Sequence, residues 1–283
     1  MQAESAASQT ALMVCAYRAR ESRAARPLFV DPWAEALAGA DGEALAARLE
    51  AQFPPMGLWL ALRVAYLDRL VGLAVDRLSV RQVVILGAGY DTRAARLPRS
   101  GTTYFEVDHP ATQAAKRARL AALPGYPVDA ARYVACDFER QDPITQLVDR
   151  GFDVREPALV IWEGVVPYLT EAAVRATATR LAAGLDPRSV VAFDFVGKKL
   201  VEGSSANTAD HATRQYVGEL GEPLRFGAND ILPLCADAGF RWVRSLDFNQ
   251  LALELCGDYV RDRQFRFQHI ALCSRTTPAI GWP

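Results

Sequence analysis

The stretch VVILGAGYDTR, residues 83–93, decides the fold. Its four apolar residues, 83–86, have the length and composition of a buried strand, and Gly87 and Gly89 follow at once. Glycines at a strand-to-helix turn let the backbone approach a ligand at the carboxyl edge of a parallel sheet. The third glycine of the dinucleotide-binding pattern would fall at Thr92, so the pyrophosphate form of the motif is absent. A tight turn without a ligand is the alternative.

Short apolar strands alternate with helical patterns from residue 81 onward, and this predicts a mostly parallel sheet covered on both faces. We expect helices over residues 111–123, 143–150 (capped by Asp142) and 171–183, and a helix capped by Asn229 that ends near Gly239. The polar stretch 197–210 is predicted to be a loop or a mobile segment. The expected strands are 83–86, 103–108, 132–137, 159–163, 189–195, 242–246 and 269–274.

Residues 1–80 have the pattern of helices. Asp31 and Pro32 predict the start of a helix that continues to Ala40. A second helix, over residues 58–78, carries an apolar stripe with spacings of three and four. We therefore expect an N-terminal helical cap, residues 1–80, that belongs to the same domain as an α/β core over residues 81–283.

Composition excludes several classes of protein. Lys and Arg number 32 against 33 for Asp and Glu, so the chain lacks the cationic surplus that nucleic-acid binding requires. The five cysteines are widely spaced without a C-x-x-C pair, which is typical of a reducing compartment. No apolar run reaches membrane-spanning length, and the first 20 residues lack a basic n-region. We expect a soluble cytoplasmic protein without a metal site.

Two carboxylates close consecutive predicted strands. Asp108 ends TTYFEVD, where an acidic side chain can accept both ribose hydroxyls of a nucleoside. Asp108 could also cap the helix that follows Pro110. Asp137 and Phe138 follow RYVAC, and a carboxylate next to a large apolar side chain suits an adenine. Together these positions predict a nucleoside site.

Two charged residues lie in apolar surroundings. Glu163 ends an apolar strand, where an unpaired carboxylate is costly unless a cation meets it. Arg63 lies at the edge of the apolar stripe of its helix, where recognition of a ligand carboxylate would account for it. The alternatives are structural: an ion pair between Glu163 and a nearby arginine, and one between Arg63 and an aspartate such as Asp91.

The combination of LGAGYDTRAARL (86–97), YFEVDHP (104–110), ACDFE (135–139) and WEGVVPYLT (162–170) resembles the leucine carboxyl methyltransferase-like family of class I S-adenosylmethionine-dependent O-methyltransferases. The segments TALMVCAYRARES (10–22) and LFVDPWAEAL (28–37) resemble its bacterial members. The resemblance implies a seven-stranded Rossmann-like sheet with an N-terminal helical extension, and S-adenosylmethionine as cofactor.

The resemblance also assigns residues to the cofactor. Arg63 and Arg18 would hold the methionine carboxylate, with Arg20 as an alternative to Arg18. Glu163 would meet the methionine amino group, and the nucleoside would lie against the remaining positions, Gly87, Gly89, Asp108, Asp137 and Phe138.

The methyl acceptor is less defined than the cofactor. The sequence indicates a carboxylate or a hydroxyl of a small molecule or natural-product intermediate, and it identifies no general base. Tyr168 and His211 are the substrate-side candidates. A nicotinamide-dependent oxidoreductase and a non-catalytic cofactor-binding protein are the alternative functions.

Overall fold

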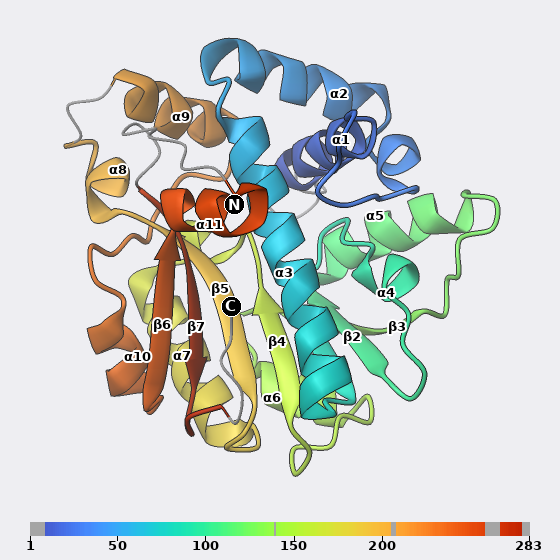
Figure 1. The fold of residues 1–283 in the computed structure, drawn as a ribbon, viewed down its shortest axis with the longest axis vertical. Coiled ribbons are helices and arrows are strands. Elements are labelled where there is room, and N and C mark those ends of the chain that lie inside the picture. The colour runs from blue at the N-terminus through green and yellow to red at the C-terminus, as the bar shows by residue number, and fades with distance from the viewer. Residues whose placement is uncertain (1–8, 139, 205–207, 258–266, 279–283) are drawn as a thin grey trace.

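A computed structural model describes residues 9–138, 140–204, 208–257 and 267–278. Its seven strands form one sheet in the order β3-β2-β1-β4-β5-β7-β6 (Figure 1). Strands β1 to β5 are parallel, and β7 runs antiparallel to both of its neighbours. This confirms the expected seven-stranded, mostly parallel α/β fold. The strands are β1 Gln82–Leu86, β2 Thr103–Asp108, β3 Ala131–Ala135, β4 Ala158–Trp162, β5 Val190–Val196, β6 Trp242–Asp247 and β7 Gln268–Ser274.

The helices alternate with these strands as right-handed crossovers require. They are α1 Gln9–Ser22, α2 Ala34–Gln52, α3 Met56–Leu78, α4 Arg93–Arg96, α5 Pro110–Ala121, α6 Pro143–Val148, α7 Glu171–Gly184, α8 Lys198–Glu202, α9 Thr208–Glu219, α10 Leu232–Ala238 and α11 Phe248–Cys256, with a short 3₁₀ turn at Val166–Tyr168. In the part of the chain that is described, none of them is both long and apolar enough to cross a bilayer.

The strands are buried on both faces, so they are apolar throughout rather than alternating. In β1, Val83 and Ile85 pack with α1, α2, α3 and α11, whereas Val84 and Leu86 pack with α6, α7 and α10. Figure 1 shows α3 and α11 in front of the sheet and α6 and α7 behind it. The first three helices therefore share one hydrophobic core with the sheet.

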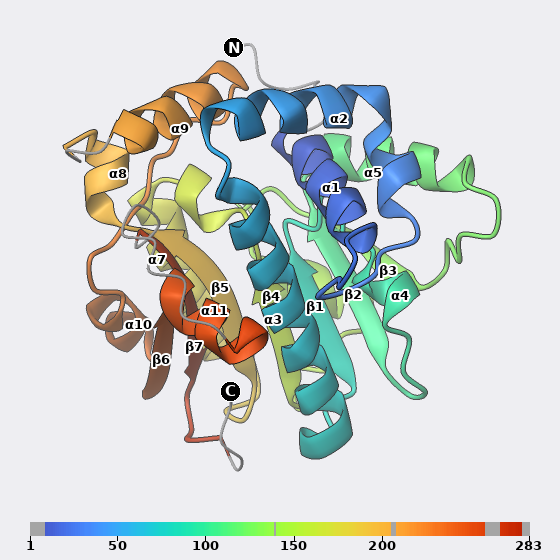
Figure 2. The same cartoon turned by 45° about the horizontal axis from the view of Figure 1, so that its top comes forward.

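Helices α1, α2 and α9 cover the end of the sheet at which β1 to β5 finish (Figure 2). Helices α2 and α9 are joined directly, because Arg48 forms an ion pair with Glu219 at 2.8 Å and the Tyr216 hydroxyl donates to the Leu45 carbonyl. This roof encloses the carboxyl edge of the sheet, where the sequence placed its candidate site.

Three local predictions are wrong. The described part of the stretch 197–210, which excludes residues 205–207, contains α8 and the start of α9 instead of a loop, because Leu200 gives α8 a buried face and Gly203 ends it in the left-handed region. Asn229 does not cap α10; the Leu232 amide donates to Asp230 instead. Asp31 does not cap a helix either. One oxygen of Asp31 accepts from the Trp33 amide, the other is held by Arg18 and Thr92, and α2 begins only at Ala34.

Candidate functional site

A cavity of about 400 Å³ lies at the carboxyl edge of the sheet, below the roof of α1, α2 and α9. Its wall combines the ends of β1, β2, β4 and β5 with residues from α1, α3 and α9. All the cofactor positions predicted from the sequence line this one cavity. They are Arg18, Arg63, Gly87, Gly89, Asp108, Asp137, Phe138 and Glu163.

The glycine turn after β1 forms the floor of the cavity. Gly87 has φ +66°, and a Cβ built there would lie 2.1 Å from Cγ2 of Val165. Gly89 has φ +46° and faces Ala11 of α1. The positive φ at both positions favours glycine, and at Gly87 there is also no space for a side chain.

Asp108 joins this turn to the end of β2. Its carboxylate accepts hydrogen bonds from the Gly89 amide at 2.5 Å and the His109 amide at 2.7 Å. Burial raises the pKa of Asp108, and these two amides act against that shift. The alternative cap role is wrong, because His109 is the residue that accepts from the Ala111 amide at the start of α5.

Asp137 and Phe138 follow β3 on the same side of the cavity as Asp108. Phe138 is buried, while the Asp137 carboxylate is partly exposed and lies 3.6 Å from Arg140. The Asp137 amide donates to the side chain of Gln141, which fixes this turn. An apolar ring and a partly exposed carboxylate are thus presented together.

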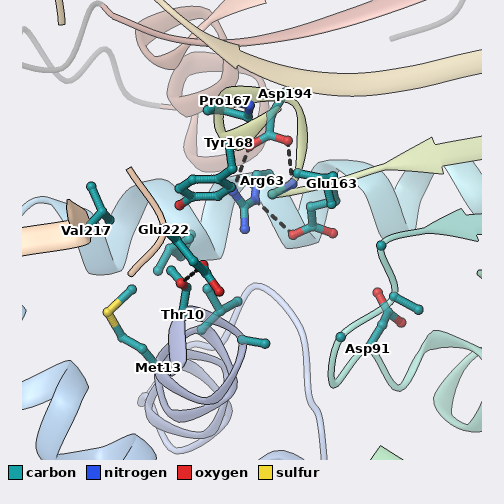
Figure 3. Close-up of a pocket in the computed structure, with 18 of the residues that line it drawn as sticks. Thr10, Met13, Arg63, Asp91, Glu163, Pro167, Tyr168, Asp194, Val217 and Glu222 are labelled. Atoms are coloured by element: carbon teal, nitrogen blue, oxygen red, sulfur yellow. Dashed lines mark hydrogen bonds and ion pairs between the residues drawn. The ribbon is translucent and has the colours of Figure 1, made fainter. Parts of the chain in front are cut away.

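Arg63 enters the cavity from α3 and binds two carboxylates (Figure 3). Its Nε donates to Glu163 at 2.9 Å and its Nη1 donates to Asp194 at 2.8 Å; Arg63 and Asp194 are buried, and Glu163 is partly buried. The structural alternative for Arg63, an ion pair with an aspartate, is therefore present, with Asp194 in place of Asp91. Burial raises the pKa of Asp194 against the opposing effect of Arg63.

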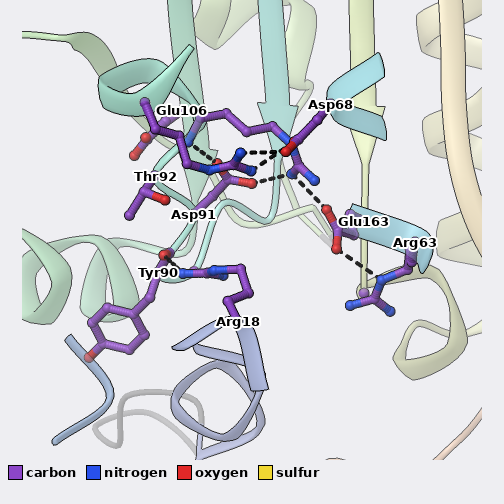
Figure 4. A network of polar contacts seen from close by, with 12 residues as sticks. Arg18, Arg63, Asp68, Tyr90, Asp91, Thr92, Glu106 and Glu163 are labelled. Carbon is purple, nitrogen blue, oxygen red and sulfur yellow. Dashed lines mark hydrogen bonds and ion pairs between the residues drawn. The ribbon is translucent and has the colours of Figure 1, made fainter. Parts of the chain in front are cut away.

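Glu163 is shared between Arg63 and a second arginine, Arg93 (Figure 4). Nη1 of Arg93 donates to Glu163 at 2.6 Å and pairs also with Asp91, while its Nε donates to Asp68 at 2.7 Å. Burial alone would raise the pKa of Glu163, but Arg93 and Arg63 hold it below its ordinary value. Glu163 thus forms ion pairs with two arginines, which is the structural alternative considered for it in the sequence.

Arg18 reaches the cavity from α1. Its Nε pairs with Asp31 at 2.9 Å, and its Nη2 donates to the Tyr90 carbonyl and the Cys15 sulfur. The alternative candidate Arg20 instead pairs with Glu43 and Glu50 and does not line the cavity. This geometry selects Arg18 of the two.

Each cavity arginine keeps one donor nitrogen that no described residue engages. Nη1 of Arg18 and Nη2 of Arg63 make no hydrogen bond with the described residues. Neither nitrogen is among the buried polar atoms that lack a partner, so both retain access to the cavity. An anion between them could accept from two guanidinium groups, which is the donor arrangement that a carboxylate prefers.

The two substrate-side candidates are placed differently. Tyr168 lines the cavity beside Arg63, and Figure 3 shows Glu222 close to its ring. Burial raises the pKa of Tyr168 and Glu222 raises it further, so the phenol stays protonated at neutral pH. His211 lies on α9 with an exposed side chain and is absent from the described lining.

Four residues of the site were missed in the sequence. Asp194 is an acid inside the apolar strand VVAFDFV, and that pattern alone signals a buried partner. Arg93 closes the opening motif itself. The hydroxyl of Thr10 donates to Glu222, and this contact links α1 to the segment after α9. No local pattern in the sequence predicts it.

The sequence profile described as leucine carboxyl methyltransferase matches residues 11–182. The chain belongs to this family. A Mycobacteroides abscessus protein named as an S-adenosyl-L-methionine-dependent methyltransferase is 31% identical over 222 residues, or 75% of this chain and 74% of that one. A Mycobacterium tuberculosis relative of the same name is 38% identical over 65% of each chain. This member of the leucine carboxyl methyltransferase family is therefore an S-adenosylmethionine-dependent methyltransferase.

Solved structures agree on the fold of this family member. A DUF574 family protein from Streptomyces avermitilis superposes with a TM-score of 0.65 at 12% identity, covering 94% of this chain and 97% of that one. The magnesium protoporphyrin IX methyltransferase of Synechocystis, solved with bound S-adenosylhomocysteine, superposes with a TM-score of 0.51 at 14% identity, over 84% and 95% of the two chains.

Proposed function

We propose that this chain is an O-methyltransferase that acts on a carboxylate or hydroxyl of a small molecule or natural-product intermediate. The observation that supports the proposal is the extent of the cavity lining. It continues past Arg63 and Tyr168 to residues of α1, of α9 and of the segment after α9, and a small acceptor would lie there, beside the methionine end of the cofactor.

The nucleoside of the cofactor would lie against the Gly87 turn. Asp108 already accepts two backbone amides, and a carboxylate has about four lone-pair directions in all, so it retains acceptor capacity for both ribose hydroxyls. Asp137 and Phe138 would bind the adenine by its exocyclic amine and its ring. Gly87 and Gly89 let the backbone approach the cofactor closely.

The methionine end would lie between Arg18 and Arg63. Their two remaining guanidinium nitrogens suit the cofactor carboxylate, and Glu163 suits its amino group. When bound, the cofactor supplies an activated methyl group on a sulfonium. The protein's task is then to align the acceptor and exclude water, which is the role we assign to residues 1–80 as a lid within the same domain.

Two ligands separate the cofactor role of Arg63 from a purely structural one. S-adenosylhomocysteine contains the amino-acid part, whereas methylthioadenosine keeps the nucleoside and lacks the carboxylate. Arg63→Lys retains a charge but loses the planar fork that serves several acceptors. We expect about a tenfold loss of affinity for S-adenosylhomocysteine, worth about 1.4 kcal/mol, and little change for methylthioadenosine.

Isothermal titration calorimetry measures both affinities. Arg96→Lys is the matched control, because Arg96 also forms a buried ion pair, with Asp68, but does not line the cavity. An equal loss for both ligands, or the same selective loss in the control, would show that Arg63 serves the fold rather than the cofactor. Labelled methyl transfer to panels of acids and hydroxyl compounds then tests the acceptor class.

A further inference from the structure

One part of the cavity lining carries none of the positions assigned to the cofactor; we call it the acceptor chamber and define it by Met13, Trp59, Tyr168, Val217, Glu222 and Leu224. Figure 3 shows Met13, Val217 and Glu222 gathered near Tyr168, away from Asp91 at the nucleoside side. Four of its six members are apolar, so most of its wall favours apolar ligand surface.

The charges around the chamber are unfavourable for an anion. Within the described part of the chain, the cavity lining contains two arginines, Arg18 and Arg63, and no lysine. Arg63 is matched by the carboxylates of Glu163 and Asp194, and Arg18 by that of Asp31. Any remaining donor capacity of these two arginines is needed for the cofactor carboxylate. A carboxylate acceptor would therefore enter the chamber without a cation of its own.

Glu222 contributes a carboxylate to the wall of the chamber. The Thr10 hydroxyl donates to its Oε2, so the carboxylate is held by α1 at the chamber wall. Thr10 is buried and Glu222 is half-buried. Like charges placed together at low solvent exposure repel strongly. Glu222 would thus disfavour an acceptor carboxylate and favour a group that carries a proton to give.

Tyr168 complements Glu222 at the same wall. Its phenol is a hydrogen-bond donor, because burial and the nearby Glu222 carboxylate keep its pKa above the ordinary value for tyrosine. A donor and an acceptor in one lining suit a hydroxyl group, which accepts through its lone pairs and donates through its proton. A carboxylate has no proton to satisfy the acceptor.

We propose that the acceptor chamber takes a neutral, largely apolar hydroxyl compound, such as a phenol or enol, and that Glu222 accepts its proton. This inference rests on the proposed O-methyltransferase function and narrows it to hydroxyl acceptors. In the transfer, a bond forms between the acceptor oxygen and the methyl carbon while the methyl–sulfur bond breaks and leaves its electron pair on sulfur. The hydroxyl proton passes to Glu222 and then to water, so charge and atoms balance.

Two probes of similar shape test whether the chamber prefers a neutral ligand to an anionic one, and the test measures only their binding. 1-Naphthol is neutral and 1-naphthoate is its anionic counterpart. Each is titrated into the full-length protein saturated with S-adenosylhomocysteine. We expect naphthol to bind about tenfold more tightly than naphthoate. Glu222→Gln should reduce this ratio to about threefold or less, mainly by improving naphthoate binding, since the repulsive charge is gone. Glu219→Gln is the control, because Glu219 pairs with Arg48 of α2 at an exposed position and does not line the cavity.

Methyl transfer to naphthol gives a second readout, and it should fall in Glu222→Gln more steeply below neutral pH than at pH 9, where more of the acceptor is already ionised. The inference is overturned if naphthoate binds as tightly as naphthol, if Glu222→Gln leaves the ratio unchanged, or if neither probe binds. The S-adenosylhomocysteine titration comes first. Its failure would refute the proposed function, whereas its success followed by a naphthoate preference refutes only the hydroxyl assignment.

Discussion

Replacing Asp108 by asparagine tests the nucleoside end of the site with the smallest change of shape. The Asp108 carboxylate accepts from the amides of Gly89 and His109 through its two oxygens, and about two lone-pair directions remain for ribose hydroxyls. An asparagine side chain has one carbonyl oxygen, so it cannot accept from both amides and also from two hydroxyls. One or two charge-assisted hydrogen bonds to the ligand are lost.

Hydrogen bonds to a charged group contribute about 1.5–3 kcal/mol each. We therefore expect Asp108→Asn to weaken S-adenosylhomocysteine binding by about 2–3 kcal/mol, which is about 30- to 150-fold. The same variant also loses one backbone partner, so its free energy of unfolding should fall by about 1–2 kcal/mol. Calorimetry gives the affinity, and thermal unfolding without ligand gives the stability.

Asp142→Asn is the matched control for Asp108→Asn. Asp142 also accepts a backbone hydrogen bond, from the Ile144 amide at 3.0 Å, but it lies outside the cavity at the start of α6. It should lose at most a little stability and no affinity. An Asp108→Asn protein with unchanged affinity, or with a loss no larger than its loss of stability explains, would refute the ribose assignment.

Other changes test the surroundings of the site. Gly87→Ala should abolish cofactor binding, since a Cβ would lie 2.1 Å from Val165 at a positive φ; normal binding would contradict the close approach. Burial raises the pKa of Glu106 from 4.5 to about 7. The folded protein therefore holds this proton more tightly than the unfolded chain does, and that stabilisation is lost as the pH rises. In urea unfolding, the free energy of unfolding of the wild type minus that of Glu106→Gln should fall by at most about 3 kcal/mol from pH 4.5 to pH 8; a rise in this difference would contradict the raised pKa. Arg93→Met should cost about 3–5 kcal/mol, because Asp91 loses its arginine partner while Asp68 and Glu163 each lose one of two.

The sequence predicted the sheet well because its strands are buried on both faces. Continuous apolar runs such as residues 83–86 and 159–162 are typical of strands buried in a parallel sheet. The predicted strand boundaries agree with the structure to within two residues. The helix α11 was missed although Asp247 and Gln250 form a capping box, because its nine residues follow a strand without a break.

The partners of charged residues were harder to predict than their positions. Arg63 was identified as a costly buried cation, but its carboxylates come from β4 and β5, about 100 and 131 residues further along the chain. Periodicity carries no information on such distant pairs. Glu222 escaped notice for the same reason, since its position beside Thr10 depends on how α9 packs across α2.

A competition titration tests the central claim most directly. The purified protein is titrated with S-adenosylhomocysteine, alone and in the presence of NADH, by isothermal titration calorimetry. The proposed site predicts one S-adenosylhomocysteine bound per chain, with an affinity that saturating NADH leaves unchanged and that Asp108→Asn weakens. Tight binding of NADH together with absent binding of S-adenosylhomocysteine would contradict it.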